Sequence, residues 1–165
     1  MQSPKPNITT GVLWTLMEEV FDPEIPVLSV VDLGIIRDIK ISGEEIEMII
    51  TPTYSGCPAM DMIAMNIQMA LLKKGFEKVK ITRQLSPAWT TDWVTERGKQ
   101  QLKAYGIAPP VGKSFDSSYL EELQIECPLC HSTNTKLISE FGSTSCKALY
   151  QCNECKEPFD YFKCH

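Results

Sequence analysis

The sequence predicts an α+β fold in two parts: a small domain of helices and strands, followed by a compact cysteine-rich ribbon. Apolar residues at helical and at strand spacing follow one another through residues 1–108 of the 165-residue chain. Six of the seven cysteines lie within residues 127–165. A segment that short cannot bury an adequate core by itself, so we expect a bound metal or disulfides to hold it together.

The first part is expected to begin with a helix and a hairpin. Residues 10–20 place valines, leucines and a methionine at helical spacing behind threonine caps, which predicts a helix. The prolines of residues 22–26 (DPEIP) then end this helix and shape a loop. Residues 35–41 and 45–51 are rich in isoleucine and are separated by a Ser-Gly-Glu turn, so we expect a β-hairpin.

A second helix and a third strand complete the first domain. Residues 58–74 are apolar and compatible with a helix, which two lysines and Gly75 would end. Residues 76–85 predict a strand, and residues 91–105 predict a weaker helix. These elements indicate a small α/β domain over residues 1–108.

Two cysteine pairs dominate the tail, residues 127–165, which a linker at residues 109–126 joins to the first domain. Thiolates three residues apart on a tight knuckle can face one ion, and two knuckles complete a tetrahedral site of the structural zinc type. Strand-like runs between and after the pairs predict a three-stranded zinc ribbon holding about one zinc per chain. The expected ligands are Cys127, Cys130, Cys152 and Cys155.

Alternatives to structural zinc stay open for the tail. Four cysteines can form disulfides, and sets of four cysteines also hold iron-sulfur clusters. Cys146 and Cys164 exceed a four-thiolate site and are either buried small apolar residues, alternative ligands or a redox-labile pair. Cys146 lies six residues before Cys152, a spacing that places both on one face of one strand.

Charge and hydropathy limit the classes of molecule that the protein is expected to bind. Residues 1–108 carry 11 basic and 13 acidic side chains, and residues 109–165 carry 5 and 8, so both parts are acidic. Ribbons that grip nucleic acid need basic side chains to neutralise phosphates, so protein partners are favoured over nucleic acid. The sequence has no run of 18 apolar residues and no leader pattern. We therefore expect a protein without membrane association that lies in the cytoplasm, where thiols stay reduced.

Cys57 is the one cysteine outside the tail, and it directly precedes Pro58. Proline favours the first position of a helix, so Cys57 would be the N-cap residue, with its sulfur facing free amide hydrogens. The positive end of the helix dipole favours a thiolate there, which makes Cys57 a candidate reactive thiol; a buried structural cysteine is the equal alternative. Glu24 and Asp22 are either carboxylates facing the same pocket or ordinary turn residues.

No catalytic set accompanies these residues. Both histidines lie in the tail, so the first domain offers no Cys-His or Ser-His pair. The glycines form neither a phosphate-cradling loop nor a dinucleotide fingerprint. The methionines of the second helix are interpreted as core filling: Met60, Met62, Met65 and Met69. We therefore expect no catalysis by the chain itself.

Several segments carry a family resemblance. Residues 21–37 (FDPEIPVLSVVDLGIIR) and 51–58 (TPTYSGCP) resemble the signature of the SufT-like iron-sulfur assembly domain. Residues 84–93 (QLSPAWTTDW), 139–150 (SEFGSTSCKALY) and 157–164 (EPFDYFKC) resemble the D-subunit family of bacterial phenylacetyl-CoA epoxidase, also called phenylacetate-CoA oxygenase.

The resemblance implies an accessory role in aerobic phenylacetate degradation, where a multicomponent monooxygenase epoxidises phenylacetyl-CoA. It implies a maturation factor that helps to assemble the iron-sulfur cluster of the reductase component, with partners among the oxygenase components and the general iron-sulfur assembly machinery. Cys57, with Glu24 near it, would contact transient iron or a cluster. A stable non-catalytic scaffold subunit is the alternative, and homo-oligomer formation stays open.

Overall fold

Two separately packed units make up the chain, Met1–Trp89 and Thr90–His165. The computed structural model describes residues 7–111 and 117–163 of them, so the predicted role of Cys164 lies outside the described residues. Across the two described ranges, no helix has both the length and the apolar character needed to cross a membrane. Each unit is built around its own sheet and is described separately.

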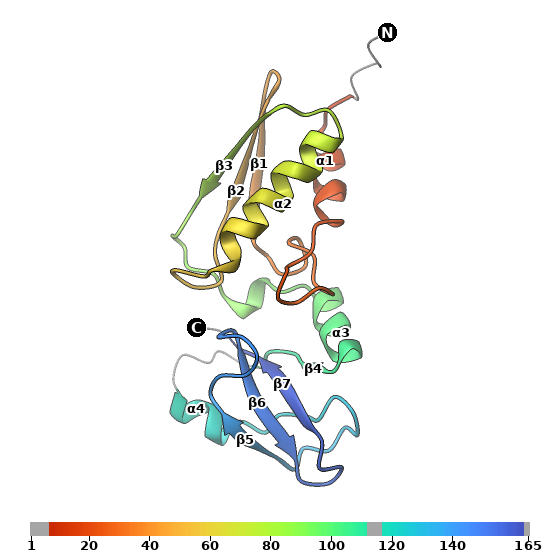
Figure 1. Ribbon diagram of the computed structural model, residues 1–165, viewed down its shortest axis with the longest axis vertical. Helices are drawn as coiled ribbons and strands as arrows, with labels where there is room; N and C mark the ends of the chain where they lie inside the picture. Colours follow the sequence, from red (N-terminus) through yellow and green to blue (C-terminus); the bar gives the residue numbers. More distant parts are fainter. Residues whose placement is uncertain (1–6, 112–116, 164–165) are drawn as a thin grey trace. The chain divides into compact units, whose positions relative to one another are not determined.

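The first unit has a three-stranded sheet with β2 in the centre. β1 pairs with β2 in antiparallel fashion, as the predicted hairpin requires, and β3 pairs with β2 in parallel after the crossover through α2. Thr9 caps the first helix, because its side chain accepts the N–H of Val12 at 3.3 Å. The elements are α1 (Thr10–Met17), β1 (Ile36–Ser42), β2 (Glu45–Ile50), α2 (Ala59–Lys73) and β3 (Lys78–Arg83) (Figure 1).

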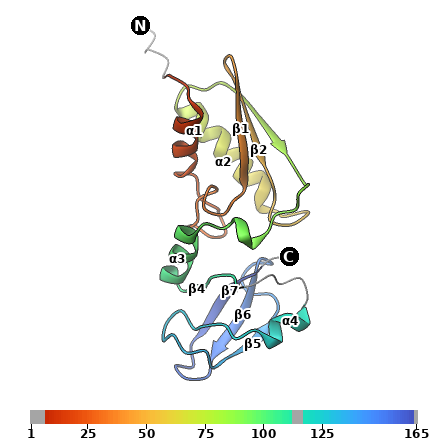
Figure 2. The same ribbon diagram turned by 180° about the vertical axis from the view of Figure 1, so that it is seen from behind.

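The helices lie on one side of the sheet. α2 crosses one sheet face, and α1 lies beside α2 and next to β1 (Figures 1 and 2). Charged side chains on neighbouring strands form ion pairs. The Nζ of Lys80 in β3 lies 3.2 Å from a carboxylate oxygen of Glu47 in β2. The buried core between sheet and helices includes Leu13, Met17, Ile46, Met48, Ile50, Ile63, Ile67 and Leu71.

Three segments meet at one end of this sheet. Because β1 runs antiparallel to β2 and β3, the start of β1 lies at the same end as the last residues of β2 and β3. Backbone hydrogen bonds join the segments there, from the Thr51 N–H to the Ile35 carbonyl at 2.9 Å and from the Gln84 N–H to the Ile50 carbonyl at 2.8 Å. The indole N–H of buried Trp89 donates to the Leu33 carbonyl at 2.9 Å.

The second unit contains a four-stranded sheet in the order β4-β7-β6-β5. The predicted three-stranded ribbon is present as the antiparallel strands β5, β6 and β7. A two-residue strand, β4, adds to it by pairing in parallel with β7. The elements are α3 (Glu96–Tyr105), β4 (Ile107–Ala108), α4 (Ser117–Glu122), β5 (Thr135–Ser139), β6 (Lys147–Cys152) and β7 (Pro158–Phe162), with a 3-10 turn at Thr91–Trp93.

The division of the chain differs from the one expected from the sequence, which places a boundary after residue 108 and a linker at residues 109–126. The structure divides the chain after Trp89. The physical reason is contact with the ribbon on both sides of the expected boundary, since β4 (Ile107–Ala108) pairs with β7 and the expected linker contributes to the ribbon's core. Leu120 and Ile125 from the expected linker are buried in this core, and the hydroxyl of buried Tyr150 donates to the Leu120 carbonyl at 2.7 Å.

Replacing Trp89 by phenylalanine should destabilise the first unit. The change leaves the Leu33 carbonyl without the indole N–H that it accepts and shrinks a side chain that is 4% exposed. We expect a loss of about 1–3 kcal/mol in the free energy of unfolding, measured by chemical denaturation. The same substitution at half-buried Trp14 is the control, and equal losses for both variants would contradict the role given to the Trp89 bond.

Candidate metal centre and reactive thiol

The two predicted cysteine pairs come together in the second unit. The sulfur atoms of Cys127, Cys130, Cys152 and Cys155 all lie within 4.8 Å of one another. Cys127, Cys130, Cys152 and Cys155 are free thiols, so these four sulfurs are not joined as disulfides in the structure. The sequence prediction of one four-thiolate cluster is therefore matched by the positions of the side chains.

Each cysteine pair forms the same tight knuckle. His131 and Lys156, which follow the second cysteine of each pair, both have a positive backbone φ, of 64° and 66°. In the first knuckle the Cys127 N–H donates to the Ser132 carbonyl at 2.9 Å, and in the second the Cys152 N–H donates to the Glu157 carbonyl at 3.1 Å. Non-glycine residues adopt this conformation rarely, so its recurrence indicates a shape that the surrounding site requires.

The spacing of the sulfurs fits one tetrahedral ion. Metal–sulfur bonds of about 2.3 Å in a tetrahedral site separate the sulfurs by about 3.8 Å. The sulfurs of Cys127 and Cys155 lie 3.8 Å apart, and those of Cys130 and Cys152 lie 3.5 Å apart. Both distances link one knuckle to the other. The chemistry of the donor set and its geometry therefore suit a single ion bound by four thiolates.

Electrostatics indicate that the four thiols need a cation. Burial raises the pKa of the Cys152 thiol, but backbone N–H groups of Cys155 and Glu154 donate to its sulfur and lower the pKa to about 7. For Cys155 the backbone N–H of Glu157 lowers the pKa, whereas burial and the other three thiols raise it to about 12. Adjacent thiolates repel one another, and a bound cation removes this obstacle to ionising all four.

A polar network fastens the knuckles to each other. The side-chain amide of Asn134 donates to the Glu154 carboxylate at 2.9 Å, and the Asn153 side-chain amide donates to the side-chain oxygen (Oδ1) of Asn134 at 2.8 Å. Glu154 and Asn153 are the two residues between the cysteines of the second pair. Sequence reasoning missed Asn134, because nothing in its local sequence indicates that it faces a knuckle 20 residues away.

His131 is engaged outside the four-sulfur cluster. Its Nδ1 lies 2.9 Å from a carboxylate oxygen of Glu126, which also accepts the Nζ of Lys103 from α3 at 2.8 Å. The hydrogen bond from Lys103, and then the one from His131, hold the pKa of the Glu126 carboxyl below its usual range. This ion pair links α3 to the first knuckle.

Cys146 stands apart from the four ligand candidates. It lies one residue before β6, and at even spacing along the strand it is buried like Ala148, Tyr150 and Cys152, which agrees with the expected common face. Cys146 is 6% exposed, and its sulfur lies 3.1 Å from the hydroxyl of Thr144. Its carbonyl accepts the N–H of Lys163 at 3.0 Å.

Cys57 lies at the end of the first unit's sheet where the three segments meet. It sits between β2 and α2, directly before Pro58, and its side chain is half-buried. Pro58, directly before α2, already has helical dihedral angles, φ −68° and ψ −23°, whereas a capping residue is itself non-helical. The Met60 N–H donates to the Cys57 carbonyl at 3.2 Å, so Cys57 lies where the first helical turn begins. That its sulfur faces free amide hydrogens stays a prediction.

The two loop carboxylates of the first unit differ in what the structure shows. Asp22 is 6% exposed, and one of its oxygens accepts the N–H groups of Glu24 at 2.7 Å and of Ile25 at 2.9 Å. This is the arrangement of a turn residue, the plainer of the two sequence interpretations of Asp22. Glu24 is half-buried in the loop that precedes β1, and its proximity to Cys57 stays a prediction.

Two family models match the chain, one in each part. The model described as iron-sulfur cluster assembly protein matches residues 12–82, and the model described as PaaD zinc beta ribbon domain matches residues 113–163. The second match contains all four clustered cysteines.

Two known proteins are similar to the chain in sequence. One, from Escherichia coli (strain K12), is provisionally named as the D subunit of 1,2-phenylacetyl-CoA epoxidase; it is 50% identical over 152 residues, which cover 92% of this chain and 91% of the relative. The other, from Porphyromonas gingivalis (strain ATCC BAA-308 / W83), is named Fe-S protein maturation auxiliary factor. It is 34% identical over 89 residues, covering 53% of this chain and 84% of the relative.

Solved structures support the fold. A domain of unknown function, DUF59, from Bacillus anthracis has a TM-score of 0.52 at 23% identity, covering 56% of this chain and 89% of that one. A conserved hypothetical protein from Thermotoga maritima has a TM-score of 0.51 at 26% identity, covering 61% and 98%. The sequence comparison with the relative from Escherichia coli decides the family: half of the aligned residues are identical, and the alignment covers nearly the whole length of both proteins. The protein therefore belongs to the D-subunit family of 1,2-phenylacetyl-CoA epoxidase.

Proposed function

We propose that the chain is an accessory maturation protein of phenylacetyl-CoA epoxidase, and that it assists iron-sulfur cluster assembly in the reductase component of that complex. The support is twofold. Its relative from Escherichia coli is named as a subunit of that epoxidase, and its relative from Porphyromonas gingivalis is named as an Fe-S maturation factor. The first unit, which matches the iron-sulfur assembly model, carries Cys57.

The position of Cys57 is the observation that carries this proposal. A half-buried thiol in the loop before α2 can supply one ligand to iron or to a cluster while leaving the other coordination positions to donor and client. Contact through one thiolate suits transient transfer, because exchange then requires breaking a single metal–sulfur bond from the carrier. Glu24, from the loop before β1, is proposed as a second contact with the metal.

The four clustered cysteines have a different role in this proposal. They form a closed site that leaves no coordination position for substrate, which is the arrangement of structural zinc. All four sulfurs crowd around one point, and thiolates that bind the several irons of a cluster are spread farther apart. We assign zinc to this site, and the ribbon serves to recognise protein partners.

The proposed partners are the reductase and other oxygenase components, together with the general iron-sulfur assembly machinery. Work on cysteine-bound iron requires reduced thiols, so the cytoplasm is the proposed location. A stable non-catalytic scaffold subunit is the second candidate, favoured by the subunit name of the relative from Escherichia coli. Co-purification separates the two roles, since a scaffold stays at fixed stoichiometry in the active complex and a maturation factor does not.

Replacing Cys57 by serine or alanine should lower the cluster content of a co-expressed reductase several-fold. The physical reason is the loss of the one thiolate that the first unit can offer to iron. Iron and acid-labile sulfide per reductase, with the visible absorption of the cluster, are the measurements.

The matched control is Ser55→Ala, an exposed position in the same loop, which should leave the cluster content unchanged. Thermal unfolding confirms that each variant folds. If the reductase co-expressed with a folded Cys57→Ser variant contains its full complement of cluster, the proposed role of Cys57 is wrong.

Metal analysis of the purified protein should find about one zinc per chain. Changing Cys127 or Cys152 to serine should remove the zinc and unfold the second unit, because both side chains are fully buried in the cluster. Cys146→Ser is the control and should retain the metal, since its sulfur lies outside the group of four. Iron with visible absorption in place of zinc would overturn the assignment.

A further inference from the structure

α2 is apolar on two opposite sides. Its inner side is buried and consists of Ala59, Met60, Ile63, Ile67 and Leu71. An outer stripe points away from this core and remains about half exposed: Met62 at 45%, Met65 at 46%, Met69 at 47% and Leu72 at 51%. The interpretation of these methionines as core filling is thus confirmed for Met60 and wrong for the other three.

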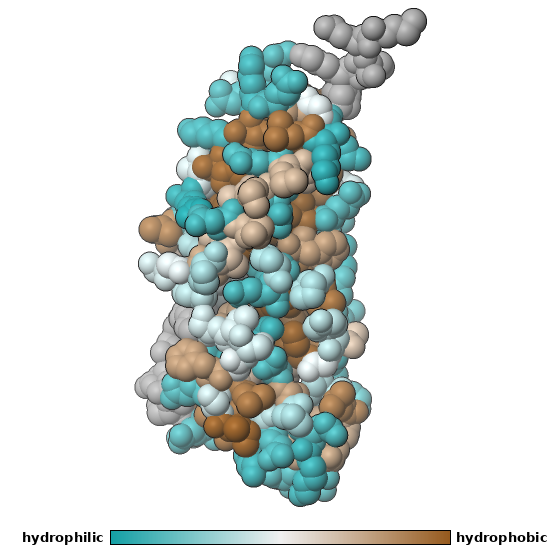
Figure 3. Space-filling view, viewed as in Figure 1, coloured by the Kyte–Doolittle hydropathy of each residue, from teal (hydrophilic) through white to brown (hydrophobic). Residues whose placement is uncertain are grey.

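The outer stripe is an unusual feature for a surface helix. Surface helices normally present polar side chains to water, and a helix that is apolar all round is normally buried. Figure 3 shows tan and brown side chains gathered over the course of α2 on this face. The stripe repeats at intervals of three, four and three residues, which is the seam spacing of two helices packed side by side.

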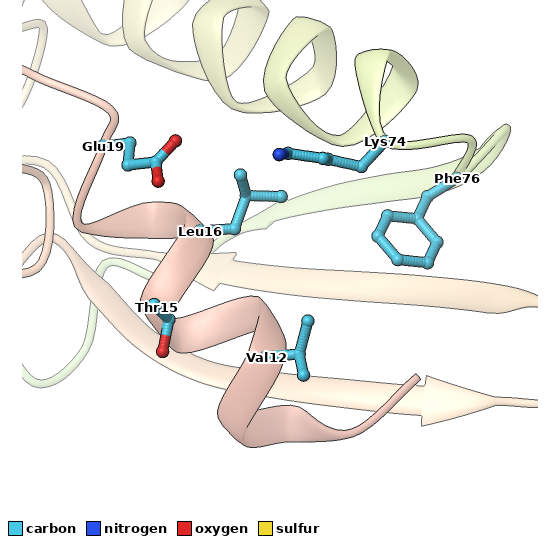
Figure 4. Close-up of a pocket in the computed structure, with 6 residues that line it drawn as sticks. All are labelled: Val12, Thr15, Leu16, Glu19, Lys74 and Phe76. Atoms are coloured by element: carbon cyan, nitrogen blue, oxygen red, sulfur yellow. The ribbon is translucent and has the colours of Figure 1, made fainter. Parts of the chain in front are cut away.

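The apolar surface continues from the outer stripe toward α1. A hollow of about 310 Å³ lies between the end of α2 and α1, with Val12, Leu16 and Phe76 in its lining. Lys74 and Glu19 extend toward one another across it (Figure 4). A neighbouring hollow shares Leu16, Glu19 and Lys74 with the first and includes Met69 of the outer stripe.

We propose that the outer stripe pairs with the outer stripe of a second copy of this chain, the two α2 helices running antiparallel. The stripe is symmetrical about Ile67, which makes it complementary to itself in this direction. With the two-fold axis at Ile67, Met62 lies level with Leu72 of the other copy, and Met65 lies level with Met69. Each seam layer then contains one residue from each half of the stripe, as in antiparallel coiled coils.

The charges of α2 favour the same direction. Its first turn contains Asp61 and its last turn Lys73, followed by Lys74. Antiparallel pairing brings each acidic first turn level with the basic last turn of the other copy and opposes the two helix dipoles. Parallel pairing would bring like-charged turns together. Asp61 contacts Arg83 within its own chain, yet its side chain is 87% exposed and accessible to a second cation.

The size of the surface predicts a weak dimer. A helix of 15 residues spans about 22 Å, so two such seams with the hollows beside them make an interface at the small end of the specific range. Methionine side chains adapt readily to a partner's shape. We therefore expect a dissociation constant in the micromolar range.

The test measures the mass of the purified full-length protein by sedimentation over a wide concentration range. We expect a monomer–dimer equilibrium that Met65→Glu shifts toward monomer by at least tenfold in dissociation constant. Gln68→Glu adds the same charge to an exposed position of α2 outside the stripe and should leave the equilibrium unchanged. Circular dichroism should show native folding in both variants, since both positions are exposed.

A charge-pair rescue tests the register. The Met65→Glu chain mixed with the Met69→Lys chain should dimerise again, because positions 65 and 69 are level in the antiparallel seam. Rescue by Met65→Glu with Met65→Lys instead would indicate a parallel seam and overturn the proposal. A protein that stays monomeric at all concentrations would also overturn the proposal, and it is the result expected if the stripe binds a different protein. A dimer that Met65→Glu leaves intact would overturn it as well. None of these outcomes depends on Cys57.

Discussion

The second unit depends on four thiols being held at one point. Sulfurs within 4.8 Å of one another cannot all carry negative charge unless a cation lies among them. At Cys155 the backbone N–H of Glu157 lowers the pKa of the thiol, yet burial and the other three thiols raise it to about 12, as such crowding requires. Around this point the chain places two knuckles of the same shape, each with a left-handed residue after its second cysteine. The antiparallel strands that these knuckles join have only five or six residues each, and Cys127 and Cys152 are part of the same buried core as the ribbon's aromatic side chains.

The first unit presents its thiol in a contrasting way. Strand direction alone brings the segment before β1, the loop after β2 and the segment after β3 to one end of the sheet. Cys57 lies in the loop after β2. Hydrogen bonds donated by Trp89, Thr51 and Gln84 hold the backbone of the three segments together. One thiol held in this way is consistent with the transient metal contact proposed for Cys57. In that proposal the chain separates a closed set of ligands, which holds an ion, from an isolated thiol, which passes an ion on.

Patterns within one element were predictable, and relations between distant elements were not. The Cys-x-x-Cys spacing indicated the cluster because its ligands lie on two local turns, and the hairpin and both long helices followed from apolar periodicity. The extra strand β4 and the buried Leu120 were missed because their pairing partners are supplied by strands far along the chain. The Cys-Pro step at the start of α2 was visible in the sequence, because proline favours the first turn of a helix. Asn134 acts on a knuckle through tertiary contact, which no local sequence signal encodes.

The methionines of α2 show that the spacing of apolar residues along a helix does not by itself tell which side of the helix faces the core. Apolar residues recur on this helix so often that the pattern is satisfied by either side facing the sheet, and sequence alone cannot say which residues remain outside. The structure assigns Ile63, Ile67 and Leu71 to the core, which leaves the outer stripe in water. Exposing several large side chains in one row costs about 25 cal/mol for each Å² of apolar surface. A stripe that is also symmetrical in spacing and opposite in charge at its ends has the properties that self-association requires. The residues that define it lie on the opposite side of α2 from the core, so a second copy can cover them while the sheet stays unchanged.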